Sequence, residues 1–109
     1  MPRKRTVAIE MAAYLLIDIA SVHDPVAYAD YRARVSAGLA AAGGRYIVRG
    51  GPVEVLEGTW QPGRVVVVRF ESADAARRWW SSDAYAALRD LRQASTTTHM
   101  VLVEGVADE

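Results

Sequence analysis

The chain has 109 residues, which is enough for one domain with a single hydrophobic core and too short for two. Thirteen Lys and Arg balance thirteen Asp and Glu, so the formal net charge is zero and nucleic-acid binding is not expected. There is no cysteine, which excludes disulfides, thiolate metal sites and a cysteine nucleophile; we expect a reducing, cytoplasmic location.

The first ten residues are expected to be a basic extension outside the folded domain. Residues 3–5 are three basic residues in a row, and residues 6–10 are too short and interrupted for a signal peptide. The longest apolar run, residues 12–17, is ended by Asp18 and falls far short of the ~20 residues of a membrane helix. We therefore expect no membrane partner, one domain over residues 11–106, and a polar tail over residues 107–109.

The first part of the domain predicts a strand followed by a helix. Residues 13–20 are rich in branched side chains and apolar on both sides, which is typical of a central strand. Asp24 is a suitable helix N-cap, and Pro25 suits the first helical position, where its missing N–H costs no hydrogen bond. Apolar residues at spacings of three and four then predict an amphipathic helix, which Gly43 and Gly44 end.

The middle of the chain predicts a long hairpin. Residues 45–49 are expected to form a strand that bends at a Gly-Gly-Pro sequence and resumes over residues 53–57. Pro52 favours an edge position for this strand. After a turn-rich segment, residues 64–70 have the clearest strand pattern in the chain.

The last part predicts two helical stretches and a closing strand. Ser72 and Ser82 are each suited to cap the first turn of a helix, because their hydroxyls accept hydrogen bonds from backbone N–H groups. Residues 97–104 are then expected to form the final strand.

This order of elements predicts the α+β class and a ferredoxin-like βαββαβ fold. In that topology four antiparallel strands are ordered 4-1-3-2 and the helices cover one face of the sheet. The first strand also has Tyr14, Leu16 and Asp18 on its other side, so both faces favour burial. A second copy is the simplest cover for the open face, and we predict a homodimer whose two sheets pack together as a barrel.

Several short motifs, taken in their order along the chain, carry a family resemblance. They are Gly43-Gly44-Arg45, Arg49-Gly50-Gly51, residues 55–58, residues 64–70, residues 80–85 and Leu91-Arg92. Over residues 12–106 the chain resembles the domain-of-unknown-function family numbered 1330. The resemblance implies the dimeric α/β-barrel superfamily, with its ferredoxin-like fold and homodimer, and implies no accepted activity. Relatives in the wider superfamily include cofactor-free monooxygenases, lactone isomerases, polyketide-type cyclases and haem-handling enzymes.

His99 and Asp18 are the candidates for catalysis. His99 begins the last strand, which should run antiparallel beside the first, so the two side chains are expected at the same end of the sheet. A carboxylate that orients an imidazole is the usual arrangement of a general base. The alternative is a satisfied histidine and a carboxylate that pairs with a nearby arginine, neither with a catalytic role.

Six more residues are candidates for substrate binding. Arg49 and Arg69 lie in otherwise apolar strands, where a guanidinium needs a carboxylate, a carbonyl or a ligand anion; Arg49, beside the glycine bend, is the favoured anion clamp. Trp60 lies in the hairpin loop and needs a partner subunit or a ligand to cover it. The remaining candidates are the aromatic residues Tyr14, Trp80 and Tyr85. Packing in the core or in a dimer interface is the alternative for these aromatic residues.

Two classes of function stay open. The first is a cofactor-free, metal-free enzyme that binds a small, partly apolar molecule and performs isomerisation, cyclisation, lactone formation or oxygenation. The second is a non-catalytic dimeric module that binds a metabolite or a partner protein, in which Asp18, His99 and Arg49 bond to one another or across the dimer and leave no cavity. Haem binding through His99 is a minor third hypothesis. No nucleotide-binding glycine loop and no nucleophile elbow is present in the sequence.

Overall fold

The computed structural model describes residues 11–107. Its elements are β1 (Ala13–Val22), α1 (Pro25–Ala41), β2 (Arg45–Arg49), β3 (Arg64–Phe70), α2 (Ala73–Trp80), α3 (Asp83–Ser95) and β4 (Thr96–Glu104). The predicted basic extension, residues 1–10, lies outside the described residues. Among residues 11–107, none of the helices has the length and hydrophobicity that crossing a membrane requires.

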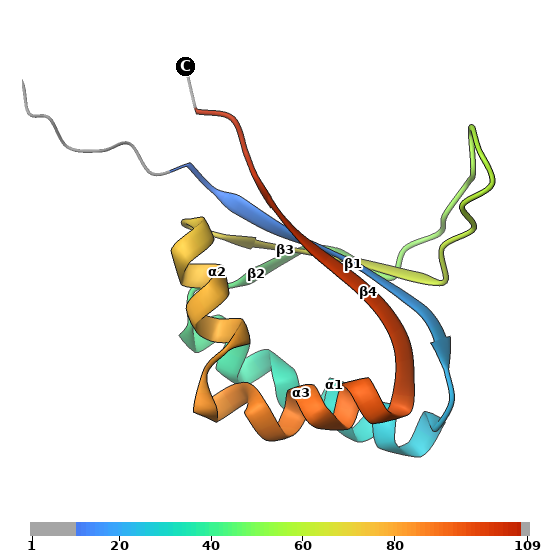
Figure 1. Cartoon of the computed structure of the whole chain (residues 1–109), viewed down its shortest axis with the longest axis horizontal. Coiled ribbons are helices and arrows are strands. Elements are labelled where there is room, and N and C mark those ends of the chain that lie inside the picture. Colours follow the sequence, from blue (N-terminus) through green and yellow to red (C-terminus); the bar gives the residue numbers. More distant parts are fainter. Residues whose placement is uncertain (1–10, 108–109) are drawn as a thin grey trace, which may run out of the picture.

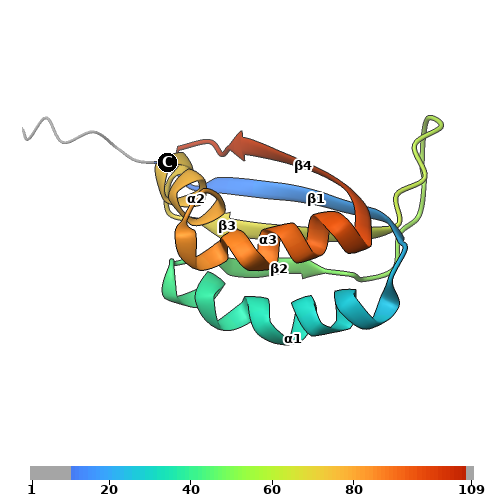
Figure 2. The ribbon, with the colours of Figure 1, turned by 60° about the horizontal axis from the view of Figure 1, so that its bottom comes forward.

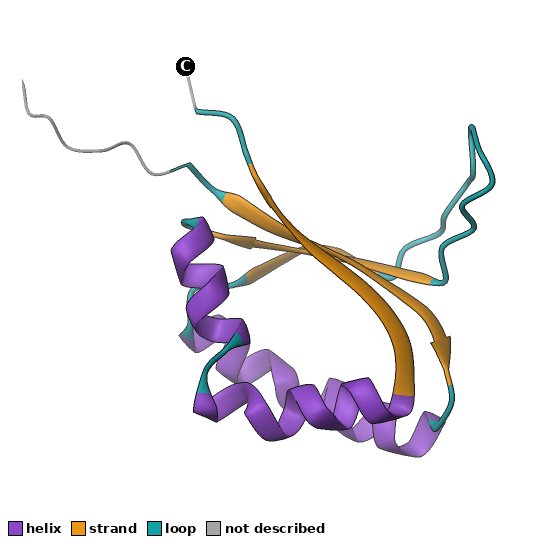
Figure 3. Cartoon of the chain, in the orientation of Figure 1, coloured by secondary structure: helices purple, strands orange, loops and turns teal. Residues whose placement is uncertain are grey.

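The four strands form one antiparallel sheet in the order β2-β3-β1-β4. Figures 1 and 2 show α1 and α3 lying beneath the sheet and α2 near one end of it. All three helices are on the same side of the sheet, and the long loop between β2 and β3 projects from the other side (Figure 3). The predicted ferredoxin-like topology and strand order are therefore confirmed.

The ends of the helices follow from the predicted caps. The Asp24 carboxylate accepts a hydrogen bond from the Ala27 N–H at 3.1 Å, and Pro25 begins α1. Ser72 and Ser82 accept in the same way at the starts of α2 and α3. Gly43, just beyond α1, has a φ of +90°, which a residue without a Cβ adopts most easily.

The core lies between the sheet and the helices. Phe70 of β3 is fully buried and its ring lies 5.9 Å from that of Trp79, which in turn stacks on Tyr85 at 4.0 Å. The helix-facing residues of β1, at positions 15, 17 and 19, are all buried against this cluster. Of the two adjacent tryptophans in α2, Trp79 is the core residue, and Trp80 is more exposed.

One predicted element is wrong. Residues 53–57 were expected to continue the β2 strand, but β2 ends at Arg49 and residues 51–60 form an irregular loop. Gly50, with a φ of +74°, turns the chain out of the sheet, and Pro52 has no N–H to offer a strand ladder. The valines at 53 and 55 consequently lie exposed in the loop.

Candidate functional site

A pocket of about 810 Å³ lies between one half of the sheet and the helices α2 and α3. Its apolar lining comes from strands β1 and β4 and from α2: Leu15, Met100, Val101, Leu102, Ala76 and Trp80. Its polar lining comes mainly from the C-terminal end of α3 and the start of β4: Arg92, Gln93, Thr96 and Thr98. Apolar walls with a few convergent polar groups are typical of small-molecule sites.

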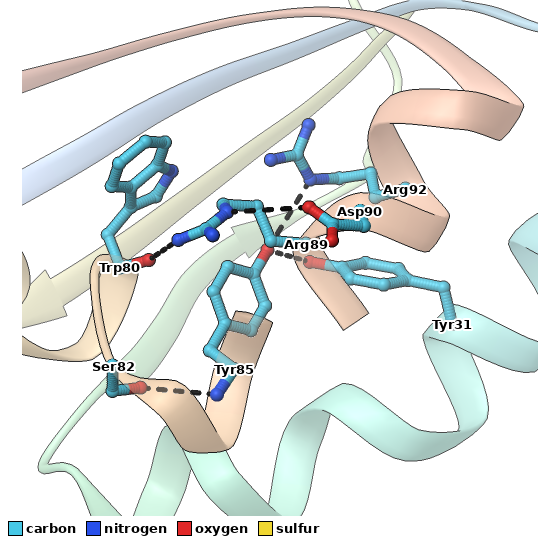
Figure 4. Close-up of polar contacts among 7 residues, drawn as sticks. All are labelled: Tyr31, Trp80, Ser82, Tyr85, Arg89, Asp90 and Arg92. Carbon is cyan, nitrogen blue, oxygen red and sulfur yellow. Dashed lines mark hydrogen bonds and ion pairs between the residues drawn. The ribbon is translucent and has the colours of Figure 1, made fainter. Parts of the chain in front are cut away.

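Arg92 is the most deeply buried charged group of this pocket. Its side chain comes from α3 and the residue is only 5% exposed. Its Nε donates to the Tyr85 hydroxyl at 3.4 Å, and its two outer nitrogens point away from that hydroxyl (Figure 4). Among residues 11–107 no other hydrogen bond of this guanidinium is found.

Two tyrosines lie behind Arg92. Tyr31 reaches across from α1, and its hydroxyl is 2.7 Å from the hydroxyl of Tyr85 (Figure 4). Burial, together with the neighbouring Tyr85 hydroxyl, raises the pKa of Tyr31 well above its usual range. Tyr31 is therefore a neutral phenol at physiological pH and carries no negative charge to Arg92.

The hydroxyls of Thr96 and Thr98 form two consecutive hydrogen bonds beside Arg92, and the donor of each can be assigned. The Thr96 hydroxyl donates to the backbone carbonyl of Arg92 at 2.8 Å, so its single proton is used. The Thr98 hydroxyl, 2.7 Å from that of Thr96, must then be the donor in their hydrogen bond. The Thr98 hydroxyl, whose proton is used in this bond, can only accept further hydrogen bonds, and Thr98 lines the pocket.

Trp80 forms the rim of the pocket at the end of α2. The Arg89 guanidinium lies 4.8 Å from the centre of a Trp80 ring and donates to the Trp80 carbonyl at 2.7 Å (Figure 4). Of the residues predicted to bind substrate, Trp80 lines this pocket and Tyr85 lies one hydrogen bond behind it.

Asp18 lies on the opposite, open face of the sheet and is held by the β2–β3 loop. The residue is 7% exposed. One carboxylate oxygen accepts from the Trp60 indole N–H at 3.0 Å and the other from the Gly63 N–H at 2.8 Å. The Trp60 indole N–H therefore has a partner within the chain, whereas the residue as a whole is 66% exposed, and its cover by a subunit or ligand stays a prediction.

The register places His99 directly beside Asp18, as predicted. Among residues 11–107 no hydrogen bond joins the two side chains: the Asp18 carboxylate accepts from Trp60 and Gly63, and the His99 side chain is exposed. In the same described range, no group of three or more His, Asp or Glu side chains comes together to hold a metal.

Arg49 does not join Asp18 and His99. It pairs with Val66, which faces the helices, and its Nη2 donates to the Ser36 hydroxyl of α1 at 3.2 Å. Its guanidinium also lies 4.1 Å from the centre of the Tyr46 ring. The expected anion clamp is therefore on the helix side of the edge strand, apart from the predicted catalytic pair.

Tyr14 and Arg69 are neighbours at the far end of the open face. Tyr14 pairs with Arg69 across β1 and β3, and Arg45 pairs with Arg69 from β2. Between this row and the row of Asp18 and His99 lies an apolar row, formed by Val48, Val67, Leu16 and Val101.

Arg92 was not among the residues predicted for the site. A signal was present, because Arg92 lies seven residues after the buried Tyr85 and so falls on the inward face of α3. The threonines at positions 96 and 98 gave no comparable signal, since nothing in their spacing indicates a pocket.

The sheet order, the helices on one face and the pocket between them define a ferredoxin-like α+β protein with a small-molecule-sized cavity. The chain belongs to the family described as Domain of unknown function (DUF1330), whose model matches residues 12–106. The predicted family is thereby confirmed. The comparison with curated proteins gave no match.

Several solved structures share the fold. The RPA0582 protein of unknown function from Rhodopseudomonas palustris superposes with a TM-score of 0.74 at 16% identity, covering 91% of this chain and 85% of that one. SnoaB, a cofactor-independent oxygenase from Streptomyces nogalater, superposes with a TM-score of 0.60 at 16% identity, covering 91% and 95%. At this identity the likeness establishes the fold alone.

Proposed function

We propose that this chain is a homodimeric enzyme that binds a small, partly apolar molecule in the pocket between the sheet and helices α2 and α3. The pocket is the observation that carries the proposal. Its volume of about 810 Å³ is in the range of sites that enclose small molecules, and its lining is apolar apart from a few polar groups.

Two reaction types fit the proposal, and neither needs an organic cofactor. No Asp, Glu or His side chain of residues 11–107 lines the pocket, so the substrate proton would pass to a hydroxide ion from solvent, which becomes water. The resulting anion can isomerise, cyclise or close a lactone, and an electron-rich anion can instead react with dioxygen. The fold shared with a cofactor-independent oxygenase supports the second reaction. The positive charge of Arg92, a residue that is 5% exposed and lines the pocket, favours any anion formed beside it.

A second candidate site lies on the open face. His99 would serve there as general base or acid, with Asp18 as its orienting carboxylate and Tyr14, Arg69 and Trp60 as binding residues. This alternative is supported by the strand register, which places Asp18 opposite His99, and by a cavity of about 540 Å³ at the β2–β3 loop. Trp60 and Val65 line this cavity, and His99 and Asp18 lie outside its wall. A substrate there and a substrate in the helix-side pocket would be on opposite faces of the sheet.

The homodimer is proposed from the open face. Leu16, Val48, Val101 and Val103 are between 41% and 56% exposed, although they lie in the middle and at one end of a sheet. Contiguous exposed apolar residues of this kind favour a partner surface, and a second copy offers the same surface in return.

The experiment that tests the function uses a panel of aromatic phenols and enolisable keto acids. Proton transfer is followed by deuterium uptake from D₂O in NMR spectra, and oxygenation by an oxygen electrode. A Thr98→Phe variant fills the pocket, and Val26→Phe adds the same side chain at the exposed start of α1 as a control. We expect turnover that Thr98→Phe lowers at least ~10-fold and the control leaves unchanged. Binding without turnover would favour the non-catalytic module.

A further inference from the structure

Arg92 is a buried cation for which the described part of the chain supplies no anion. The residue is 5% exposed, and none of the ion pairs among residues 11–107 includes it. Arginine is almost never buried this deeply without a paired charge, because an unpaired cation in a low-dielectric environment is strongly unfavourable.

The tyrosines behind Arg92 do not supply the missing negative charge. The Tyr85 hydroxyl accepts a single long hydrogen bond of 3.4 Å from the arginine Nε. Tyr31 remains protonated, since burial raises its pKa. These hydroxyls fix the position of the guanidinium and leave its charge uncompensated.

The pocket beside Arg92 has a positive lining. Arg77 and Arg92 both belong to the wall, and no carboxylate of residues 11–107 does. Arg77 is exposed and is already paired with Asp74 at 2.8 Å, so Arg92 is the cation with free capacity. A ligand anion is the simplest partner for it.

We propose that Arg92 binds the carboxylate of a small monocarboxylic acid whose apolar body lies against Leu15, Met100 and Trp80. This inference rests on the proposed function of the pocket and names the class of its substrate. A planar guanidinium with two free outer nitrogens matches the two oxygens of a carboxylate. A single buried cation balances one negative charge, which favours a carboxylate over a phosphate dianion.

The test compares an acid with its neutral isostere. 2-Naphthylacetate and 2-naphthylacetamide share their apolar body and differ in charge, and their affinities for the full chain are measured by isothermal titration calorimetry. We expect the acid to bind ~10- to 100-fold more tightly than the amide, because hydrogen bonds to charged groups are the stronger ones. In Arg92→Gln this preference should disappear, and in the control Arg34→Gln it should change less than about twofold, since Arg34 lies on α1 away from the pocket wall and is largely solvated.

A stability measurement separates a binding role from a structural one. Without ligand, Arg92→Gln should unfold at the same temperature as the wild type or higher, because the substitution removes an uncompensated buried charge. If Arg92→Gln does not fold, Arg92→Lys is measured instead, and its affinity for the acid should fall ~10-fold while its affinity for the amide is kept. Unchanged affinity of Arg92→Lys for the acid would overturn the proposal.

The remaining outcomes separate two claims: that Arg92 binds a carboxylate, and that the pocket is a ligand site. Equal binding of acid and amide, both blocked by Thr98→Phe, would overturn the role of Arg92 and leave the pocket as the ligand site. Binding of neither probe would overturn both. Inorganic phosphate that binds more tightly than the naphthyl acid, and loses this affinity in Arg92→Gln, would replace the carboxylate by a phosphate and overturn the assigned class.

Discussion

The two faces of the sheet differ in what the chain leaves without a partner: a charged group on the helix side and apolar side chains on the open side. On the helix side the apolar residues are covered by the chain's own helices, and the Arg92 guanidinium is buried with no carboxylate partner among residues 11–107. On the open side the buried carboxylate of Asp18 has two donors, and apolar residues are left uncovered. An uncompensated charge favours a small ligand, whereas an uncovered apolar surface favours another protein molecule.

Alternation along single strands produces this contrast. In β1, Leu15 and Ile17 face the helices and Leu16 and Asp18 face the other way, so one strand contributes to both sites. Most of the pocket wall and the proposed dimer surface therefore lie on opposite faces of the sheet, and only Val101, on the edge strand β4, borders both among residues 11–107. Substitutions elsewhere on one face should have little effect on the other.

The largest expected effect is the loss of packing on the helix side. Phe70→Ala should lower the free energy of unfolding by about 3–5 kcal/mol, because the ring is fully buried against Trp79 and its removal leaves a cavity. Val103→Ala, on the exposed face, should cost about 0.5 kcal/mol in the monomer. Urea denaturation of both variants measures the difference, and similar costs would contradict the assignment of the core to one face.

The next effect concerns the open face and the oligomeric state. Val101→Glu should raise the dimer dissociation constant ~100-fold or more, because each protomer would place an unpaired carboxylate in an apolar interface. Val26, which is 80% exposed at the start of α1, provides the matched control Val26→Glu, whose dissociation constant should equal that of the wild type. Analytical ultracentrifugation over a range of concentrations measures both. A wild-type chain that stays monomeric would exclude the proposed homodimer.

A smaller effect is expected where the loop is attached to the sheet. Trp60→Phe keeps an aromatic ring and removes the N–H that Asp18 accepts, which should cost about 1–2 kcal/mol and loosen residues 50–63. Hydrogen–deuterium exchange of this loop, compared with that of α1, measures the loosening. Unchanged exchange would mean that the Gly63 N–H alone holds the carboxylate.

The fold was predictable because its signals are local. Asp24, Ser72 and Ser82 each cap a helix through their own side chains, and the strand pattern of residues 64–70 needs no distant partner to be recognised. The strand predicted over residues 53–57 failed because alternating valines also occur in a loop whose apolar residues are left exposed by the rest of residues 11–107.

The site was harder to predict because it depends on which face a side chain occupies. His99 and Asp18 were correctly placed side by side by the strand order alone. The two residues that occupy the Asp18 carboxylate, Trp60 and Gly63, come from an irregular loop whose path no periodicity specifies. Arg92 became a candidate only once α3 was packed against the sheet and its guanidinium proved to have no anion among residues 11–107.

The smallest expected effect is that of a His99 substitution on ligand affinity, and it discriminates best between the two faces as the place of the reaction. His99→Ala should change the affinity of a pocket ligand less than about twofold, because His99 does not line the helix-side pocket and lies on the other face of the sheet. If turnover falls ~100-fold in this variant, the size of a general-base contribution, while pocket binding is unchanged, the reacting molecule lies on the open face beside Asp18. If both turnover and binding are unchanged, His99 has no part in the reaction and the groups of the helix-side pocket carry it. Titration calorimetry and a turnover assay on the same preparation therefore decide which face of the sheet is the active one.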